Sequence, residues 1–307
     1  MLLFVEQCLN GLQLGIFLFL VAAGLTLIFG IMGVINLAHG SLFMIGAYVA
    51  ATVTNLTGSF LVGLLAALPA AALAGVIIEF VVIRRLYDRD HLDQVLATFG
   101  LILFINEAVT MVWGRTPLFL DVPDALKGTI EIIPGIPYPI YRIAIIAAGI
   151  LVAVLMWLVI TRTRIGMLIR AGSTNREMVA ALGVDISLLY TLLFAAGAVF
   201  AGFAGAMAGP LVSVQVGMGE QILILTFVVI VIGGIGSIRG ALVGSILVGV
   251  VDTLGRAFLP DILKLFMAPA DADGIGGGLS SMLVYLLMAV VLIVRPTGLF
   301  PAAAGAR

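Results

Sequence analysis

Nine long runs of apolar residues divide the chain and set the tightest limit on its fold. They lie at about residues 9–35, 41–56, 61–83, 94–113, 141–161, 187–211, 220–235, 240–257 and 279–295, and the second and seventh are short for a full membrane crossing. Inside a bilayer only helices and closed barrels satisfy their own backbone groups, and runs of this length favour helices. The sequence therefore predicts an all-α polytopic integral membrane protein with eight or nine membrane helices, including short or broken segments.

Composition supports this class and excludes others. Of the 307 residues, 63% are hydrophobic and 10% are charged, whereas soluble domains are about 45–50% apolar. A net charge of −1 offers no basic surface for nucleic acid, and the single Cys8 permits neither an internal disulfide nor a cysteine-based metal cluster. Since no linker or soluble domain interrupts the pattern, residues 1–307 are expected to form a single membrane domain.

The polar segment between residues 161 and 187 carries four arginines. Each arginine would cost about 2.5–3.5 kcal/mol at the bilayer centre, so this segment is expected to lie in water. Within it, Thr174 and Glu177 fit a capping box that would begin a short helix, and Gly183 supplies a stop.

This short helix has an apolar face made of Met178, Val179 and Leu182 at helical spacing. A helix of roughly eight residues is too short to be stable alone in water, so a partner is expected to complete it. The sequence thus predicts that the helix docks against a cytoplasmic subunit.

The distribution of basic residues predicts the orientation. If the spans alternate and the arginine-rich segment lies inside, five of the 15 Lys and Arg residues fall outside and the others fall inside. This bias agrees with the positive-inside rule. It places the amino terminus outside and the carboxyl terminus in the cytoplasm. The outer five are Arg115, Lys127, Arg142, Arg256 and Lys264.

The connection at residues 114–140 is too long for a simple loop, and its five prolines prevent a continuous helix. Two apolar stretches within it, around residues 130–133 and 137–141, are unsuited to free movement in water. We expect an ordered outer cap or docking surface, with a mobile extracytoplasmic loop as the alternative.

Two glycine-bearing, polar breaks interrupt the apolar pattern, and both are expected near the inner side. We call them the first tip, Ile35–Ser41, and the second tip, Gly233–Gly240. Paired interruptions of this kind often mark a transport pathway and an internal repeat. In the first tip, Asn36, His39 and Ser41 either contact cargo or cap helix ends, and the spacing does not choose between these roles.

Acidic residues within the spans have partners close in sequence. Asp252 and Arg256 share a helical face, which predicts an ion pair, and Glu79 lies near Arg84 and Arg85 at the inner interface. There is no phosphate-binding loop, no zinc-protease motif and no serine-hydrolase motif. The chain is therefore predicted to be no enzyme, to hold no cofactor or metal, and to be unable to hydrolyse ATP by itself.

Four stretches resemble the permease subunit of high-affinity branched-chain amino-acid ABC importers. They are GLTLIFGIMGVINLAHGSLFMIGAY from Gly24, the arginine-rich TRIGMLIRAGSTNREMVAALGVD, VVIVIGGIGSIRGALVGSILVGV from Val228, and RPTGLF from Arg295. The resemblance implies a prokaryotic inner-membrane permease for leucine, isoleucine and valine. Its implied partners are a second related permease, two cytoplasmic ATPases, an extracytoplasmic binding protein and the lipid bilayer.

The same resemblance implies roles for the two features described above. Residues 174–182 become the coupling helix, whose apolar face enters a cleft of the ATPase, with Arg170 and Arg176 at its flanks. The two tips line the pathway or its inner gate, and the residues concerned are Asn36, His39, Ser41, Gly233, Gly234, Gly236 and Ser237.

Three alternatives stay open at the level of sequence. An ion-coupled secondary transporter would need a buried ion site, for which the spans offer few acids. An intramembrane enzyme would need a nucleophile, base or metal cluster, and none is evident. The third alternative keeps the ATP-driven mechanism and changes the cargo to urea or short amides.

Overall fold

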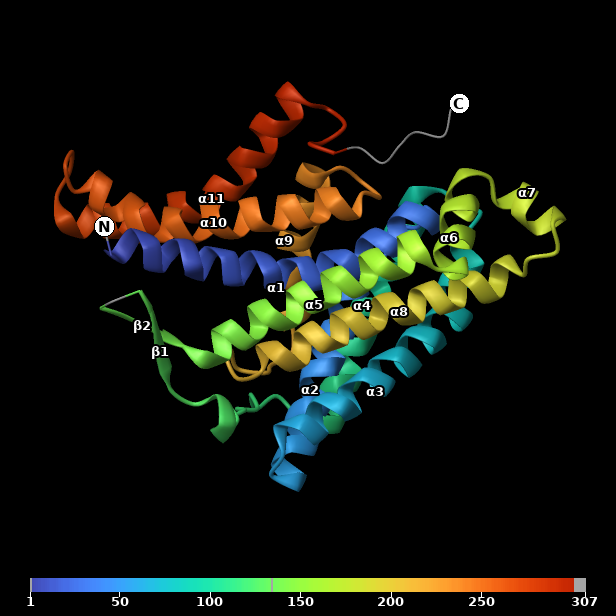
Figure 1. Ribbon diagram of the computed structural model, residues 1–307, viewed down its shortest axis with the longest axis horizontal. Helices are drawn as coiled ribbons and strands as arrows, with labels where there is room; N and C mark the ends of the chain where they lie inside the picture. Colours follow the sequence, from blue (N-terminus) through green and yellow to red (C-terminus); the bar gives the residue numbers. More distant parts are fainter. Residues whose placement is uncertain (1, 134, 301–307) are drawn as a thin grey trace. The chain divides into compact units, whose positions relative to one another are not determined.

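The computed structural model describes residues 2–133 and 135–300, and it leaves out the side chains of residues 132, 133, 136, 173, 174 and 176. Helices make up most of these residues (Figure 1). In chain order the elements are α1 Leu2–Met32, α2 His39–Thr57, α3 Phe60–Val81, η1 Ile83–Leu86, α4 His91–Trp113, η2 Asp124–Leu126, β1 Thr129–Ile133, β2 Ile136–Pro139, α5 Ile140–Arg162, α6 Arg164–Thr174, α7 Arg176–Ala181, α8 Ile186–Ala208, α9 Met218–Gly233, α10 Ile238–Leu263 and α11 Pro269–Val294.

Each of the nine apolar runs is a helix, which confirms the predicted all-α membrane class. Eight helices in the described part of the chain are long and apolar enough to cross a membrane, and α9, with 16 residues, is shorter. Helix α6 was not predicted, and neither were the two strands and the short helices η1 and η2. The arginine-rich segment contains two helices, because α6 precedes the expected short helix.

The chain divides into two compact units, each assembled from segments that are distant in sequence. The first unit contains residues 2–22, 126–150 and 225–300, and the second unit contains residues 23–125 and 151–224. The polar segment with α6 and α7 and the first tip belong to the second unit. The second tip belongs to the first unit.

Small residues allow α2, α3 and α8 to pack closely in the second unit (Figure 1). A Cβ atom at Gly46 of α2 would collide with the backbone of Gly202 in α8, and Ala50, Ala67 and Ala206 form a buried cluster. Lipid gives helices no hydrophobic reason to associate, so close backbone approach supplies the packing energy.

In the first unit, glycines likewise allow α1 and α10 to pack closely. Gly11 and Gly15 of α1 lie directly against the backbone of Val250 and Ile246 in α10. Helix α11 is tied to α10 by the Ser280 hydroxyl, which donates to the carbonyl of Gly255 at 3.0 Å. Close packing at these glycines agrees with the spacing of small residues in the sequence.

The long connection between α4 and α5 contains two strands in its described residues. Strands β1 and β2 form an antiparallel hairpin, and they coincide with the two apolar stretches noted in the sequence. Leu118 exchanges two backbone hydrogen bonds of 2.9 Å with Val214, a residue in the connection between α8 and α9. The position of this connection outside the membrane and its role in docking remain predictions.

Candidate functional site: the α6–α7 segment and the two tips

Helix α6 begins directly after the end of α5. The Thr163 hydroxyl caps it by accepting a hydrogen bond from the backbone N–H of Gly166 at 3.1 Å. The exposed Arg170 donates to the carbonyl of Ile160, near the end of α5. An arginine is favourable there because the last carbonyls of a helix have no partner within that helix.

The predicted capping box of α7 is wrong by one residue. Thr174 is the last residue of α6, so it has helical backbone angles and cannot act as an N-cap. Asn175 is extended and caps α7, since its Oδ1 accepts from the N–H of Met178 at 2.9 Å. The side chains of Thr174 and Arg176 lie outside the described residues.

The predicted end of α7 at Gly183 is confirmed. Gly183 has φ of +86°, a conformation that favours glycine, and its N–H donates to Ala180 at 2.9 Å. The N–H of Val184 donates back to Val179 at 3.4 Å. These two bonds form the Schellman arrangement that ends many helices.

The predicted apolar face of α7 divides into a buried and an exposed part. Val179 is 5% exposed, whereas Met178 is 60% and Leu182 is 78% exposed. Val179 therefore fixes α7 to its own chain. Met178 and Leu182, one turn apart, present an apolar surface that nothing in the described part of the chain covers.

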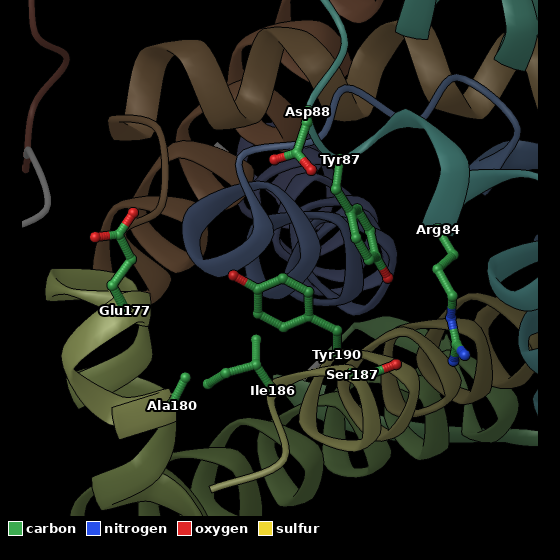
Figure 2. Close-up of a pocket in the computed structure, with 8 residues that line it drawn as sticks. All are labelled: Arg84, Tyr87, Asp88, Glu177, Ala180, Ile186, Ser187 and Tyr190. Carbon is green, nitrogen blue, oxygen red and sulfur yellow. The ribbon is translucent and has the colours of Figure 1, made fainter. Parts of the chain in front are cut away.

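A cavity of about 390 Å³ lies between α7, the start of α8 and the segment that follows η1 (Figure 2). Figure 2 shows Glu177 of α7 at the left and Asp88 at the top, with the ring of Tyr190 below them and beside Tyr87. The lining residues are Arg84, Tyr87, Asp88, Glu177, Ala180, Ile186, Ser187 and Tyr190.

Glu79 joins three elements beside this cavity. Its fully buried carboxylate accepts two hydrogen bonds from Arg84 at 3.2 and 3.1 Å and one from the Thr191 hydroxyl of α8 at 2.8 Å. The Tyr87 hydroxyl also donates to it. Burial, and then this hydrogen bond, raise the pKa of Tyr87 far above its usual value, while the bond to Glu79 raises the pKa of Arg84.

Gln94 connects the segment after η1 to the first tip. Its side-chain Nε2 donates to the carbonyls of Leu86 and Arg89, both at 3.1 Å, and its Oε1 accepts from the N–H of Ile35 at 3.0 Å. Gln94 is only 2% exposed. A buried amide that satisfies three backbone groups fixes the tip to the start of α4.

The structure gathers the predicted residues of the first tip at the buried start of α2. Asn36 and His39 are fully buried and Ser41 is 3% exposed. The Asn36 Oδ1 accepts from the N–H of Ala38 at 3.0 Å, and the imidazole of His39 lies against Gly24 of α1. Asn36 therefore holds the turn before α2, while the N-cap residue of α2, Ala38, provides no side-chain cap.

The predicted residues of the second tip connect α9 to α10. Gly233 ends α9, Gly234 and Gly236 have positive φ, and the Ser237 hydroxyl caps α10 by accepting from Gly240 at 3.1 Å. The RPTGLF motif lies against this tip. Leu299 and Phe300 donate backbone hydrogen bonds of 2.9 Å to Ile232 and Gly233, the last carbonyls of α9.

Several residues of this network were missed at the level of sequence. Gln94, Tyr87 and Thr191 are single polar residues without a motif, and their partners lie in other elements. No group of three histidine, cysteine, aspartate or glutamate side chains suited to a metal ion occurs within residues 2–133 and 135–300 as far as they are described.

Eight apolar helices of membrane-spanning length, together with a short capped helix in a polar segment, define a multi-pass membrane protein. Residues 7–299 match the family model described as the branched-chain amino acid transport system permease component. The chain belongs to this family, and it is a transport component rather than an enzyme. No solved structure matches it significantly.

Curated relatives agree with this assignment. The chain is 30% identical to the high-affinity branched-chain amino acid transport system permease protein BraD of Pseudomonas aeruginosa, over 96% of this chain and 95% of the relative. It is 28% identical to the corresponding LivH protein of Escherichia coli K12, over 97% and 96%. A probable branched-chain amino acid transport permease protein of Methanocaldococcus jannaschii is 25% identical, over 92% and 88%.

Proposed function

We propose that the chain forms the membrane pathway of an ATP-driven importer for leucine, isoleucine and valine. It works in a prokaryotic plasma membrane with its amino terminus outside and its carboxyl terminus in the cytoplasm. A second related permease, two cytoplasmic ATPases and an extracytoplasmic binding protein complete the importer, and the ATPases alone hydrolyse ATP. The names of the relatives support this cargo over urea or short amides.

The observation that carries the coupling role is the exposed pair Met178 and Leu182 on a helix that is capped at both ends. A six-residue helix needs support, and Val179 supplies it from one side only. The pair on the other side enters a cleft of the ATPase, with Arg170 and Arg176 at the flanks of the contact.

A continuous chain of contacts supports transmission from α7 to the first tip. Helix α7 leads directly into α8, whose Thr191 bonds Glu79. Tyr87 also bonds Glu79. Gln94 then bonds the carbonyls of Leu86 and Arg89, on either side of Tyr87 in the sequence, and the N–H of Ile35 in the first tip. ATP binding would draw the ATPases together, and this linkage would carry the movement to the gate as a rigid-body switch.

Each tip, taken by itself, is proposed to lie along the pathway or its inner gate. Asn36, His39 and Ser41 lie at the start of α2, and Gly233, Gly234, Gly236 and Ser237 lie between α9 and α10. Paired interruptions of membrane helices often mark a transport pathway, which supports a place along the pathway for each tip.

The double substitution Met178→Asp and Leu182→Asp tests the coupling role. It should abolish ATP-driven leucine uptake and co-purification of the ATPase, because carboxylates do not enter an apolar cleft, while membrane insertion is unchanged. The matched control, Met178→Leu with Leu182→Met, keeps the apolar surface and should retain uptake. Normal ATPase binding by the double aspartate variant would refute the assignment of α7.

The cargo is tested by uptake into vesicles that contain the assembled importer and its binding protein. Leucine, isoleucine and valine should accumulate only with ATP, and urea should not accumulate. Accumulation driven by an ion gradient in the absence of nucleotide would contradict the proposed mechanism.

A further inference from the structure

Glu220 and Asn106 form a polar pair in the second unit that no step above uses. Glu220 lies in the first turn of α9 and Asn106 lies in α4, and the amide Nδ2 donates to the carboxylate Oε1 at 2.5 Å. The other two oxygens, Oε2 of Glu220 and Oδ1 of Asn106, are buried and receive no hydrogen bond from the described residues. The pair therefore offers two unused acceptor atoms, one on the Glu220 carboxylate and one on the Asn106 amide.

This carboxylate differs from the two buried acids of the spans. Glu79 and Asp252 each bond an arginine, whereas no ion pair to Glu220 occurs among the residues that the structure describes. Glu220 and Asn106 are half-buried, but the Oε2 and Oδ1 atoms are shielded. Shielding carboxylate oxygens with a single neutral donor is costly in a membrane protein, and polar groups of this kind commonly mark a functional site. The chemistry that would complete the pair is a cation with hydrogen-bond donors.

The pair lies beside the first tip. Gly219, which precedes Glu220, packs so closely on Gly40 of α2 that a Cβ atom on either glycine would collide with the backbone of the other. Met218 is 7% exposed and Gly40 is buried, so this is an interior position. Glu220 thus belongs to the same neighbourhood as the start of α2, where the proposed gate residues lie.

We propose that Glu220, oriented by Asn106, binds the ammonium group of the amino acid during its passage. This inference rests on the proposed function, which supplies the cargo. An ammonium group has three N–H donors and one positive charge, so it matches the negative carboxylate, whose Oε2 is unused, and the unused Oδ1 of Asn106. A hard metal ion takes about six or more oxygen ligands, and the described residues hold no cluster of three side chains of metal-binding type.

The first test compares two glutamate-to-glutamine variants in the assembled importer, reconstituted in vesicles with its binding protein and ATP. Glu220→Gln should lower leucine uptake by about tenfold or more, the effect of losing a charge-assisted hydrogen bond. The control is Glu107→Gln, which makes the same change on the exposed residue beside Asn106. It should stay within about twofold of the wild type, since only the charge at Glu220 is required.

The second test reads out ammonium recognition directly. Radiolabelled leucine is first bound to the assembled importer in the absence of the binding protein. Two competitors are then compared: leucinol, which lacks the carboxylate, and 4-methylpentanoate, which lacks the ammonium. In the wild type leucinol should compete about tenfold better than 4-methylpentanoate, and Glu220→Gln should remove this difference. Asn106→Ala, which keeps the charge and removes one acceptor, should reduce the difference and serves as the second variant if Glu220→Gln does not assemble.

The outcomes separate this inference from the function it rests on. If the wild-type importer takes up no leucine with ATP, the proposed function fails. If the wild type is active and Glu220→Gln behaves like Glu107→Gln, only the ammonium site fails. The ammonium site also fails if Glu220→Gln lowers uptake but leaves the preference for leucinol intact. It fails as well if Glu220→Gln changes only the pH profile of uptake, as expected for a residue that binds a proton.

Discussion

Two ion pairs each join an acidic residue of a membrane helix to a nearby arginine, but they connect different numbers of elements. Asp252 receives two hydrogen bonds, at 2.9 and 3.0 Å, from Arg256 one turn further along α10. Glu79 receives its hydrogen bonds from Arg84, Tyr87 and Thr191, which belong to η1, to the segment after it and to α8. The first pair neutralises a charge within one helix, whereas the second joins separate elements of the second unit.

The difference between the two ion pairs cannot be inferred from the spacing of their residues in the sequence. Both pairs involve an acid and an arginine four or five residues apart, and both were visible as neighbours in the sequence. Only the structure reveals that Glu79 is fully buried and that α8 reaches it through a hydroxyl 112 positions away. Substitutions should therefore have unequal effects at the two sites.

The largest effect is expected from Glu79→Ala. Removing one partner of a buried pair typically costs about 3–5 kcal/mol, and the value here should fall at the lower end because Arg84 is one third exposed and can be hydrated. Thermal unfolding of the purified permease in detergent measures this change. A loss no greater than that of Asp252→Asn would remove the distinction between the two pairs.

Thr191→Val tests the hydroxyl that reaches Glu79 from α8. The substitution preserves shape and deletes a part-buried hydroxyl that donates to Glu79 and accepts from Arg84, both at 2.8 Å, so it should cost about 1–2 kcal/mol. In a double-mutant cycle with Glu79→Ala the two losses should not add fully, because both variants remove the hydrogen bond between Thr191 and Glu79. Full additivity would mean that α8 is held independently of Glu79.

The pH dependence of stability sharpens the comparison further. Burial raises the pKa of Tyr87 above its unfolded value of about 10. The neutral phenol therefore contributes its full stability below about pH 10, and this contribution is lost as the pH rises above that value. Wild type should lose stability above pH 10 more steeply than Tyr87→Phe, as measured by unfolding in detergent at a series of pH values. Parallel curves would contradict a buried phenol.

Asp252→Asn should have the smallest effect. Although Asp252 is buried, Arg256 is 57% exposed and stays hydrated without its partner, so the pair should be worth about 1 kcal/mol, as for pairs that reach solvent. The asparagine still accepts one hydrogen bond. Unfolding in detergent should therefore differ little from the wild type, and a loss as large as that of Glu79→Ala would show that Asp252 also has a tertiary role.

Local signals were sufficient for much of the fold. The nine apolar runs predicted the membrane helices because length and hydropathy are enough in a bilayer. The glycine stop of α7 was predictable since only the backbone at Gly183 matters. The choice between Thr174 and Asn175 as the cap was not predictable, because both residues are good caps and the extent of α6 decides between them.

Tertiary contacts limited the prediction of the candidate site. Helical spacing placed Met178, Val179 and Leu182 together, but which of them faces the rest of the chain depends on how α7 packs. Gln94 carried no signal at all, since its three partners are backbone groups of other segments. Polar residues that serve distant backbone atoms are the part of such a site that a single sequence hides.

The hydrogen bonds from Leu299 and Phe300 to the end of α9 have a consequence for biogenesis. Translation proceeds from the amino terminus, so the ribosome reaches these residues only after α10 and α11 have been made. Throughout that interval the terminal carbonyls of α9 lack these donors. Closure of the second tip is therefore a late event in maturation, and a nascent chain arrested before Arg295 would contain every membrane helix without a finished tip.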